Sequence, residues 1–324
     1  HNKLIFAIQE ERITRKKGDS SFPTKSISEA YNYCKSHDLK LDSIAVHEDI
    51  YNRDILPKQL ISSPSRLLKH VTTTSKKIVA TQTQLLEAAE YLSVPKQNIY
   101  FSSHHDSHAY APIGFYEVQE GYYLVLDAIG ECSSGSWGIV HNSKITQLHK
   151  QSISNSLGLI YSYFTVLCGF KVLTGEYKLM GLAPYGKPLF LENIKEYFGD
   201  VNNLAPRADL IDYFGERLTC EEFEQLTRFK IRNENEPILQ KHADMAASIQ
   251  CYIEELVISF LNSHSPSSAT SLSFGGGLAL NCKLNSKIVN EVDWIDQLFI
   301  FPAAGDSGSA YGACVSKNNT IRGN

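Results

Sequence analysis

The chain has 324 residues, of which 43% are hydrophobic and 20% charged, and its formal net charge of −4 with a pI near 6.3 leaves no basic footprint for nucleic acid. This composition is that of a globular protein, and no apolar run approaches the roughly 20 residues of a membrane span. The seven cysteines are scattered without a CxxC pair, which favours a reducing, cytoplasmic compartment.

The chain opens with "HNKLIFAIQEERIT", which resembles the second half of a hairpin found again in "GSWGIVHNSKITQLHKQSIS", where the turn is expected at His141 and Asn142. We therefore expect an early strand whose hairpin partner is missing at the amino terminus. The basic run "RITRKKGD" (12–19) is expected to be a solvated turn. Two related halves predict a two-lobed fold with a cleft, divided into residues 1–117 and 118–324.

Short β-rich runs alternate with helical periodicity, which predicts an α/β fold. Four of these runs end in polar or glycine-rich segments, where open α/β sheets bind ligands. They are "NIYF" (98–101), "YYLVLDA" (122–128), "SLSF" (271–274) and "LFIF" (298–301). The segment "HADMAASIQCYIEELVISFLNSH" has apolar residues at helical spacing and predicts a packing helix.

A histidine cluster, "HHDSHA", follows the first of these strands. His104 and His108 are four residues apart at the expected start of a helix, so both imidazoles would share one face. Asp127 ends a strand and Asp306 lies in the loop after another, so a folded sheet could bring both carboxylates to the same place. Such ligands suit Fe(II), Zn(II) or Mn(II), and the alternative is a pair of capping histidines.

His105 and Asp106 lie off this face. Asp106 could fix the tautomer of a ligand imidazole. For His105, contact with a substrate and a role in capping the helix are both open.

Three glycine-rich loops are expected to hold a phosphate-bearing ligand through backbone amides. They contribute Gly130 in "GECSSGSWG", the triplet Gly275, Gly276 and Gly277 in "FGGGLALN", and Gly305 in "GDSGSAYGA". None matches the Walker or the GxGxxG pattern, and each taken alone could be a tight turn. A fourth segment, "TGEYKLMGLAPYGKP" (174–188), contains three glycines and Pro184, so we expect a loop lining the cleft with Lys178 as its cation, or a connector whose lysine is solvated.

Five motifs in order, "EERITRKKGDSSFP", "HHDSHAYA", "GEYKLMGLAPYG", "FGGGLALNCKLN" and "FPAAGDSGSAYGA", resemble the carbamoyltransferases that modify nodulation factors, antibiotics and other secondary metabolites. The resemblance runs from residue 1 to about 316. It implies a two-lobed actin-like and sugar-kinase-like ATPase fold with duplicated ribonuclease-H-like halves, related to the protein that transfers a threonylcarbamoyl group to tRNA.

The same resemblance implies a site. His104, His108 and Asp306 match the ligands of a metal usually taken as iron, with Asp127 as an additional carboxylate. The triplet 275–277 and Asn281 match the adenosine-binding loop.

The implied reaction is transfer of a carbamoyl group from carbamoyl-adenylate to a hydroxyl of a small-molecule acceptor. Family members usually have an earlier His-Asp loop that helps to activate this hydroxyl, so the base expected here is His105 or Asp106, with Lys178 as a further catalytic candidate. They usually also have a second domain that makes carbamoyl-adenylate from carbamoyl phosphate and ATP, so a separate domain or protein is expected to supply it. The rival functions are an ATP-dependent kinase on the same fold and a non-catalytic, nucleotide-binding regulatory subunit.

Overall fold

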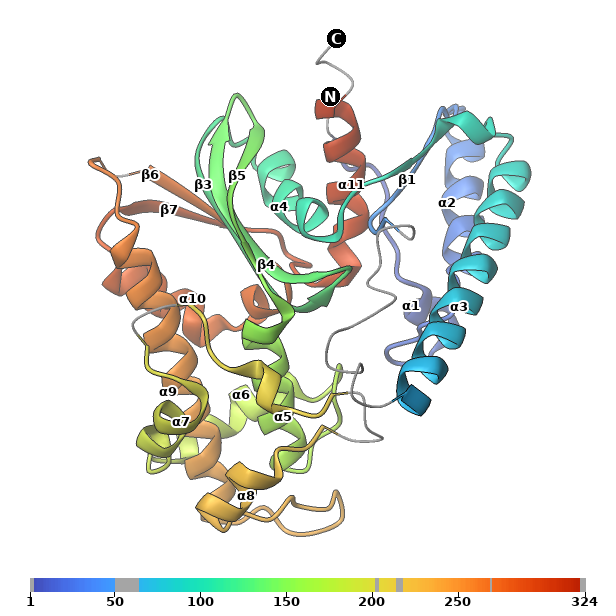
Figure 1. Ribbon diagram of the computed structural model, residues 1–324. Coiled ribbons are helices and arrows are strands. Elements are labelled where there is room, and N and C mark those ends of the chain that lie inside the picture. The colour runs from blue at the N-terminus through green and yellow to red at the C-terminus, as the bar shows by residue number, and fades with distance from the viewer. Residues whose placement is uncertain (1–2, 50–63, 202–203, 214–217, 269, 321–324) are drawn as a thin grey trace.

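A five-stranded mixed sheet forms the centre of the larger part of the molecule in the computed structural model, which describes residues 3–49, 64–201, 204–213, 218–268 and 270–320 (Figure 1). The strand order is β5-β4-β3-β6-β7, with β3, β4 and β5 antiparallel and with β6 and β7 parallel to β3. The strands are β3 (Glu120–Gly130), β4 (Ser133–His141), β5 (Lys144–Gln151), β6 (Thr270–Gly275) and β7 (Ile295–Ile300). This is the order of a ribonuclease-H-like half, and the predicted α/β class is confirmed.

The hairpin predicted in this part of the sequence is confirmed as β4 and β5. Its two turn residues are Asn142 and Ser143, one position later than expected, with φ values of 51° and 58°. Positive φ at both central residues is the signature of the type I′ turn, whose twist matches that of the strands it joins.

Helices cover both faces of this sheet. On one face, Leu124, Trp137 and Phe274 pack against α5 and α9 in the main hydrophobic core. On the other face, Tyr123 and Val125 pack against α4 and α11 in a smaller core. The helices are α4 (His104–Phe115), α5 (Leu157–Leu167), α9 (Gln240–Ser263), α10 (Cys282–Glu291) and α11 (Asp306–Thr320). The predicted helix over 242–264 is therefore confirmed as α9.

Helices α4 and α11 cross at backbone distance. A Cβ atom at Gly312 would lie 1.7 Å from the carbonyl oxygen of Ser107, and one at Gly114 would lie 2.5 Å from Val315. Only glycine permits such an approach. The crossing fixes the middle of α11 against α4, at both the beginning and the end of that helix.

A smaller layer stands beside the sheet and contains a parallel pair, β1 (Ile44–Val46) and β2 (Ile99–Phe101), with the helices α2 (Thr24–Ser36) and α3 (Pro64–Tyr91) (Figure 1). The two layers are joined through α11, because the Lys317 ammonium lies 4.3 Å from the centroid of the Tyr100 ring. Helix α4 follows β2 in sequence and packs on β3 and β6. The boundary after residue 117 and the cleft between two lobes stay predictions.

The expected strand at the amino terminus is wrong for the described residues. Residues 3–9 have no regular structure and lead into α1 (Glu10–Thr14). A strand requires a neighbouring strand for its backbone hydrogen bonds, and no described strand pairs with this segment. Residues 12–14 of the basic run belong to α1, whereas the residues after them form the predicted solvated turn, in which the Gly18 amide donates to the Glu11 carboxylate at 2.7 Å.

Residues 174–188 are not a loop. They form α6 (Glu176–Leu182) and the 3₁₀ helix η4 (Ala183–Tyr185), followed by α7 (Leu191–Phe198) and α8 (Glu221–Thr227). Gly175 is the N-cap of α6 and Gly186 the C-cap of η4, so these two glycines bound the helices. Gly181 alone lies within α6, where a Cβ atom would meet open space.

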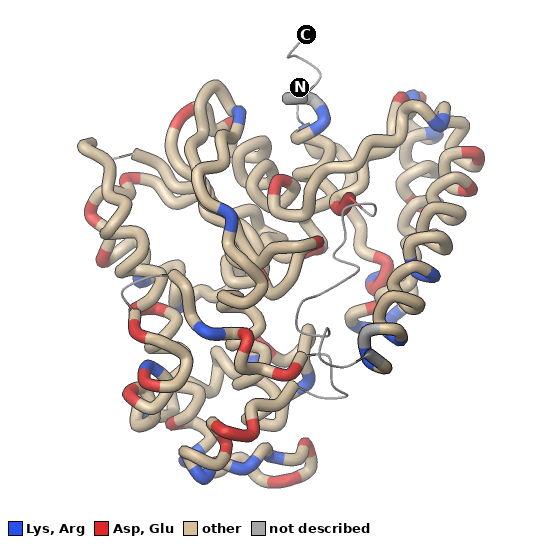
Figure 2. Tube along the Cα trace, viewed as in Figure 1, with Lys and Arg blue, Asp and Glu red and all other residues tan. Residues whose placement is uncertain are grey.

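Acidic and basic residues are interspersed along the described chain (Figure 2), in agreement with the small net charge of −4. None of the helices in the described ranges combines the length and the apolar character that a membrane crossing requires.

Asn281 begins α10 and is buried. Its side chain accepts a hydrogen bond from the Leu284 amide at 3.1 Å and forms a reciprocal amide pair with Gln250 at 2.9 and 3.1 Å. Asn281→Ala should lower the free energy of unfolding by about 2 kcal/mol, since it removes an N-cap and leaves a buried amide without its partner. Chemical denaturation measures this loss. Asn290→Ala, an exposed change in the same helix, should stay within about 0.5 kcal/mol of wild type, and equal stabilities of all three proteins would contradict the structural role.

Candidate metal centre

Helix α4 presents two imidazoles on one face at its amino-terminal end. Ser103 caps the helix by accepting from the Asp106 amide at 3.2 Å. His104 and His108 follow one turn apart, 6% and 1% exposed. Because the sheet and α11 surround this helix, neither ring faces bulk water.

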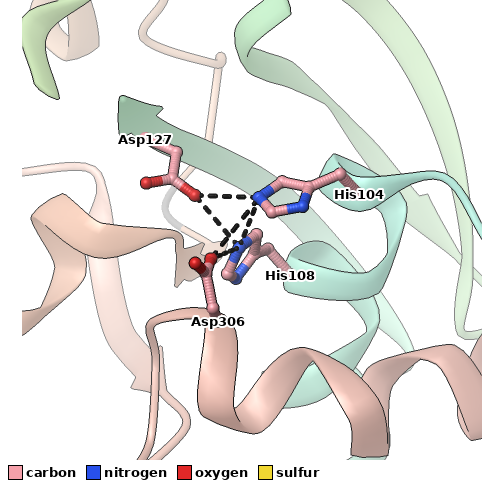
Figure 3. Close-up of side chains that lie close together, drawn as sticks. All are labelled: His104, His108, Asp127 and Asp306. Carbon is pink, nitrogen blue, oxygen red and sulfur yellow. Dashed lines mark hydrogen bonds and ion pairs between the residues drawn. The ribbon is translucent and has the colours of Figure 1, made fainter. Parts of the chain in front are cut away.

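Two carboxylates meet these rings, one from β3 and one from α11 (Figure 3). Asp127, on β3, places Oδ2 3.1 Å from Nε2 of each histidine. Asp306, the first residue of α11, places Oδ1 3.5 Å from His104 Nε2 and 3.3 Å from His108 Nε2. The sequence prediction that these four side chains converge is confirmed by the geometry, since their ligand atoms all lie within 4.8 Å of one another.

The donor set fits a divalent transition metal. A metal ion about 2.1 Å from each ligand holds tetrahedral ligand atoms about 3.4 Å apart, close to the histidine–carboxylate separations of 3.1 to 3.5 Å seen here. His108 Nδ1 lies 3.1 Å from the Ala304 carbonyl oxygen. A carbonyl only accepts, so Nδ1 carries the proton and Nε2 offers its lone pair to the site.

Without a metal ion, the four side chains form a closely packed ionic cluster. Burial would lower the pKa of His108, but the hydrogen bonds that its ring donates to the Asp127 and Asp306 carboxylates raise this pKa to about 9. Burial would raise the pKa of Asp127, but the hydrogen bonds from the two histidines hold it well below its usual range. Asp306 is the open side of the cluster, with 69% of its side chain exposed.

The glycine triplet lies directly beside these ligands. The Gly277 amide donates to Asp127 Oδ1 at 3.4 Å, and the Gly276 amide donates to the Ala304 carbonyl at 3.1 Å. Gly276 has a φ of 89°, and a Cβ atom there would lie 2.3 Å from the Leu126 carbonyl oxygen. The sequence attributed these glycines to a bound phosphate, whereas the structure shows that close packing already requires glycine at 276.

The other residues predicted to bind nucleotide differ in their surroundings. A Cβ atom at Gly130 would lie 2.4 Å from the His104 ring, so this glycine makes room for a ligand side chain. At Gly305 it would meet only the end of the Leu280 side chain, at 3.2 Å. The side chain of Asn281 is occupied within the protein, as described above. Their contacts with a nucleotide stay predictions.

His105 and Asp106 face away from the four ligands. His105 Nδ1 bonds to Ser133 Oγ at 2.9 Å, and burial lowers the pKa of this imidazole to about 3. A base this weak takes up a proton poorly at neutral pH. Burial raises the pKa of Asp106, which lies within the first turn of α4. The structure therefore gives no support to the prediction that either one is the base.

Lys178 is exposed on α6, and none of its described contacts reaches the ligand group. Its catalytic role stays a prediction. Its neighbour Tyr177 instead contacts the basic turn, where the Lys17 ammonium donates to the tyrosine hydroxyl at 3.2 Å.

Two residues beside the site were missed in the sequence. His47 directly follows β1, and its ring centroid lies 6.1 Å from that of His104. Glu131 follows β3, and its carboxylate accepts from the His104 amide at 3.1 Å. Polar residues after a short strand, the signal that identified Asp127, were also present at "IAVHED".

A family model described as the carbamoyltransferase N-terminus matches residues 1–315. The chain belongs to the carbamoyltransferase family. The predicted resemblance is confirmed, because the match extends over almost all of the 324 residues.

Several full-length proteins are similar to this carbamoyltransferase chain. An uncharacterised protein of Synechocystis is 34% identical over 97% of this chain and 53% of its own length. The nodulation protein NolNO of Sinorhizobium fredii is 29% identical over 98% of this chain and 45% of its own length. Among solved structures, HypF of T. kodakarensis aligns with a TM-score of 0.40 and 15% identity over 75% of this chain and 39% of its own. The chain thus spans about half the length of the relatives it matches.

Helix α4 offers a paired test of metal binding by the candidate ligands. His108→Ala should abolish stoichiometric binding of Fe(II), Zn(II) or Mn(II), because it removes one of four convergent donors. His105→Ala, which removes a buried imidazole facing away, should retain the metal. Elemental analysis after dialysis measures both, and equal metal content in the two variants would exclude the site.

Gly277 tests the fit between the glycine triplet and the ligands. A Cβ atom there would lie 3.0 Å from Asp127 Oδ1 and 4.0 Å from its Cγ, with no other contact within 4 Å. Gly277→Ala should therefore displace this carboxylate slightly and weaken metal binding by about 10-fold, at the lower end of effects from disturbed ligand surroundings. Gly181→Ala, which meets open space, is the control. Unchanged metal affinity in Gly277→Ala, measured by chelator competition, would contradict this packing.

Proposed function

We propose that this chain is an O-carbamoyltransferase domain. It transfers a carbamoyl group from carbamoyl-adenylate to a hydroxyl of a small-molecule acceptor, such as a sugar or another secondary metabolite. Family membership supports the transferred group. The observation that carries the proposal is the group of His104, His108, Asp127 and Asp306 beside a glycine loop.

The ligand chemistry separates this reaction from phosphoryl transfer by a kinase. Kinases hold Mg²⁺ through carboxylates, phosphates and water, because this ion prefers oxygen ligands. Two buried imidazoles favour Fe(II), Zn(II) or Mn(II) instead, and the family resemblance favours Fe(II). Once bound, the ion supplies a Lewis-acidic charge for the carbamoyl oxygen or the adenylate phosphate.

The reaction balances without a further reactant. The acceptor oxygen forms a bond to the carbamoyl carbon, the bond from this carbon to the adenylate phosphate oxygen breaks, and AMP leaves. The hydroxyl proton is released to water. Two glycines of this chain adjoin the two carboxylates: the Gly277 amide donates to Asp127, and Gly305 directly precedes Asp306, the exposed ligand.

The nucleotide is expected on the same side as the glycine triplet. Gly276 and Gly277 follow β6 and lead into the 3₁₀ helix η6 (Gly277–Leu280), after which α10 begins. Carboxyl ends of parallel strands are the usual ligand-binding edge of such sheets. Asp127 lies on the neighbouring strand β3, just beyond its pairing with β6, so adenylate bound at this edge would place its phosphate beside the metal ligands. A separate domain or protein would supply the carbamoyl-adenylate.

Release of AMP from synthetic carbamoyl-adenylate tests the function. The metal-loaded chain should release AMP faster when a hydroxylated acceptor from a panel is present, and a carbamoylated product should appear by mass spectrometry. His108→Ala should reduce the acceptor-dependent rate by about 100-fold or more, in the range seen when one charge-stabilising group is removed. The rate without acceptor gives the hydrolytic background.

A different result would favour the regulatory-subunit alternative. If the metal-loaded chain binds carbamoyl-adenylate in calorimetry but releases no AMP with any acceptor, the proposed transfer is contradicted. Transfer of phosphate from ATP to an acceptor would instead favour a kinase.

A further inference from the structure

The two ligand histidines are held in different ways. The His108 ring is oriented through its own Nδ1, which donates to the Ala304 carbonyl at 3.1 Å. His104 Nδ1 is buried and makes no hydrogen bond to any described residue. Apart from the contacts of its Nε2 with the other members of the cluster, the orientation of His104 therefore comes from its backbone and from packing around its ring.

Glu131 supplies the backbone contact. It lies in the turn between β3 and β4, and its Oε1 accepts from the His104 amide at 3.1 Å. His104 is the first residue of α4, and the first amides of a helix have no partner within the helix. A carboxylate is the most favourable partner there, because the helix dipole is positive at this end.

The same turn also packs against the imidazole. Gly130 leaves room for the ring, since a Cβ atom there would lie 2.4 Å from His104 Cδ2. Glu131 follows with a φ of 49°, a conformation that strains a residue with a Cβ atom. Glycine would relieve this strain but would lose the carboxylate. The turn thus contacts His104 from two directions, through its amide and through its ring.

The Glu131 carboxylate also contacts a third segment. Its Oε1 accepts from the Asp49 amide at 2.8 Å, two residues beyond His47. The Ser107 hydroxyl donates to the His47 carbonyl at 3.4 Å, which joins this segment to α4 a second time. The segment 47–49 is therefore fixed to the helix that carries both ligand imidazoles.

We propose that Glu131 is a positioning residue: through the amides of His104 and Asp49 it holds the first metal ligand and the segment after β1 in one fixed arrangement. The role of Glu131 in metal binding requires only that the candidate metal centre binds a metal ion. Its part in transfer, by placing His47 beside the reacting groups, rests on the proposed function.

Cobalt(II) binding tests the positioning of His104 without any transfer assay. Glu131→Ala should weaken Co(II) binding by about 10- to 100-fold, as losses of residues that orient metal ligands do, and should change the visible absorption of the bound ion. Glu131→Gln retains an oxygen acceptor at the same distance and should stay within about fivefold of wild type. Glu117→Ala is the matched control, because Glu117 is exposed and has a similar φ of 56°; it should bind Co(II) as wild type does.

Two outcomes would overturn the proposal. Wild-type affinity and absorption in Glu131→Ala would remove any role in positioning, even if its melting temperature falls. An equal loss in Glu117→Ala would assign the effect to backbone strain. Should Glu131→Ala not fold, Glu131→Asp replaces it: a shorter carboxylate should weaken Co(II) binding more than Glu131→Gln does, and the reverse order contradicts the proposal.

The part in transfer has its own measurement. With saturating metal, Glu131→Ala should lower kcat for AMP release by about 10-fold or more while the KM for carbamoyl-adenylate changes little, because the reactants bind but are misplaced. An unchanged kcat would contradict the role of Glu131 in transfer. A wild-type chain that releases no AMP would contradict the proposed function and leave the Co(II) result standing.

Discussion

The carbonyl oxygen of Ala304 is the point on which the arrangement of the site depends. It accepts one hydrogen bond from His108 Nδ1 and another from the Gly276 amide, both at 3.1 Å. Three segments distant in sequence thereby share one acceptor: the ligand helix α4, the glycine loop after β6, and the loop before α11. A carbonyl has two lone pairs, and both are used here. Since Asp306 follows two residues later, this oxygen also sets the position of the fourth ligand.

The residues recovered from the sequence are those with local signals. The HxxxH spacing located His104 and His108, because four residues make one helical turn. Asp127 was located because a polar residue ended an apolar strand. The missed residues depend on neighbours that no local pattern reveals. Glu131 accepts hydrogen bonds from the amides of His104 and Asp49, and His47 lies beside the His104 ring. The misjudged segment 174–188 shows the same limit, because Gly175 and Gly186 lie at the ends of its helices and Gly181 does not interrupt α6. The expected amino-terminal strand is not formed by residues 3–9, with which no described strand pairs.

Glycine has several roles around this centre. At 130 it accommodates a ligand ring, at 276 it permits both a positive φ and contact with the Leu126 backbone, and at 312 it lets α11 cross α4. Glycine-rich loops in a sequence can therefore reflect close packing within a site, and they do not by themselves indicate a bound ligand. The charged cluster needs this density, because carboxylates and imidazoles buried together are stable only when each one is paired.

The crossing of α4 and α11 also bears on the order in which the molecule folds. The hydrogen bond from His108 to Ala304 closes a loop of 196 residues, and Asp306 lies just beyond it. Contacts of such long range form late, since the chain entropy of the loop must be lost before they contribute. During synthesis on a ribosome, α4 emerges long before α11. The imidazoles of His104 and His108 are therefore made well before the Asp306 carboxylate that they contact. A metal ion that requires all four ligands would bind tightly only after this closure, and its binding would stabilise the completed fold over every partly folded one.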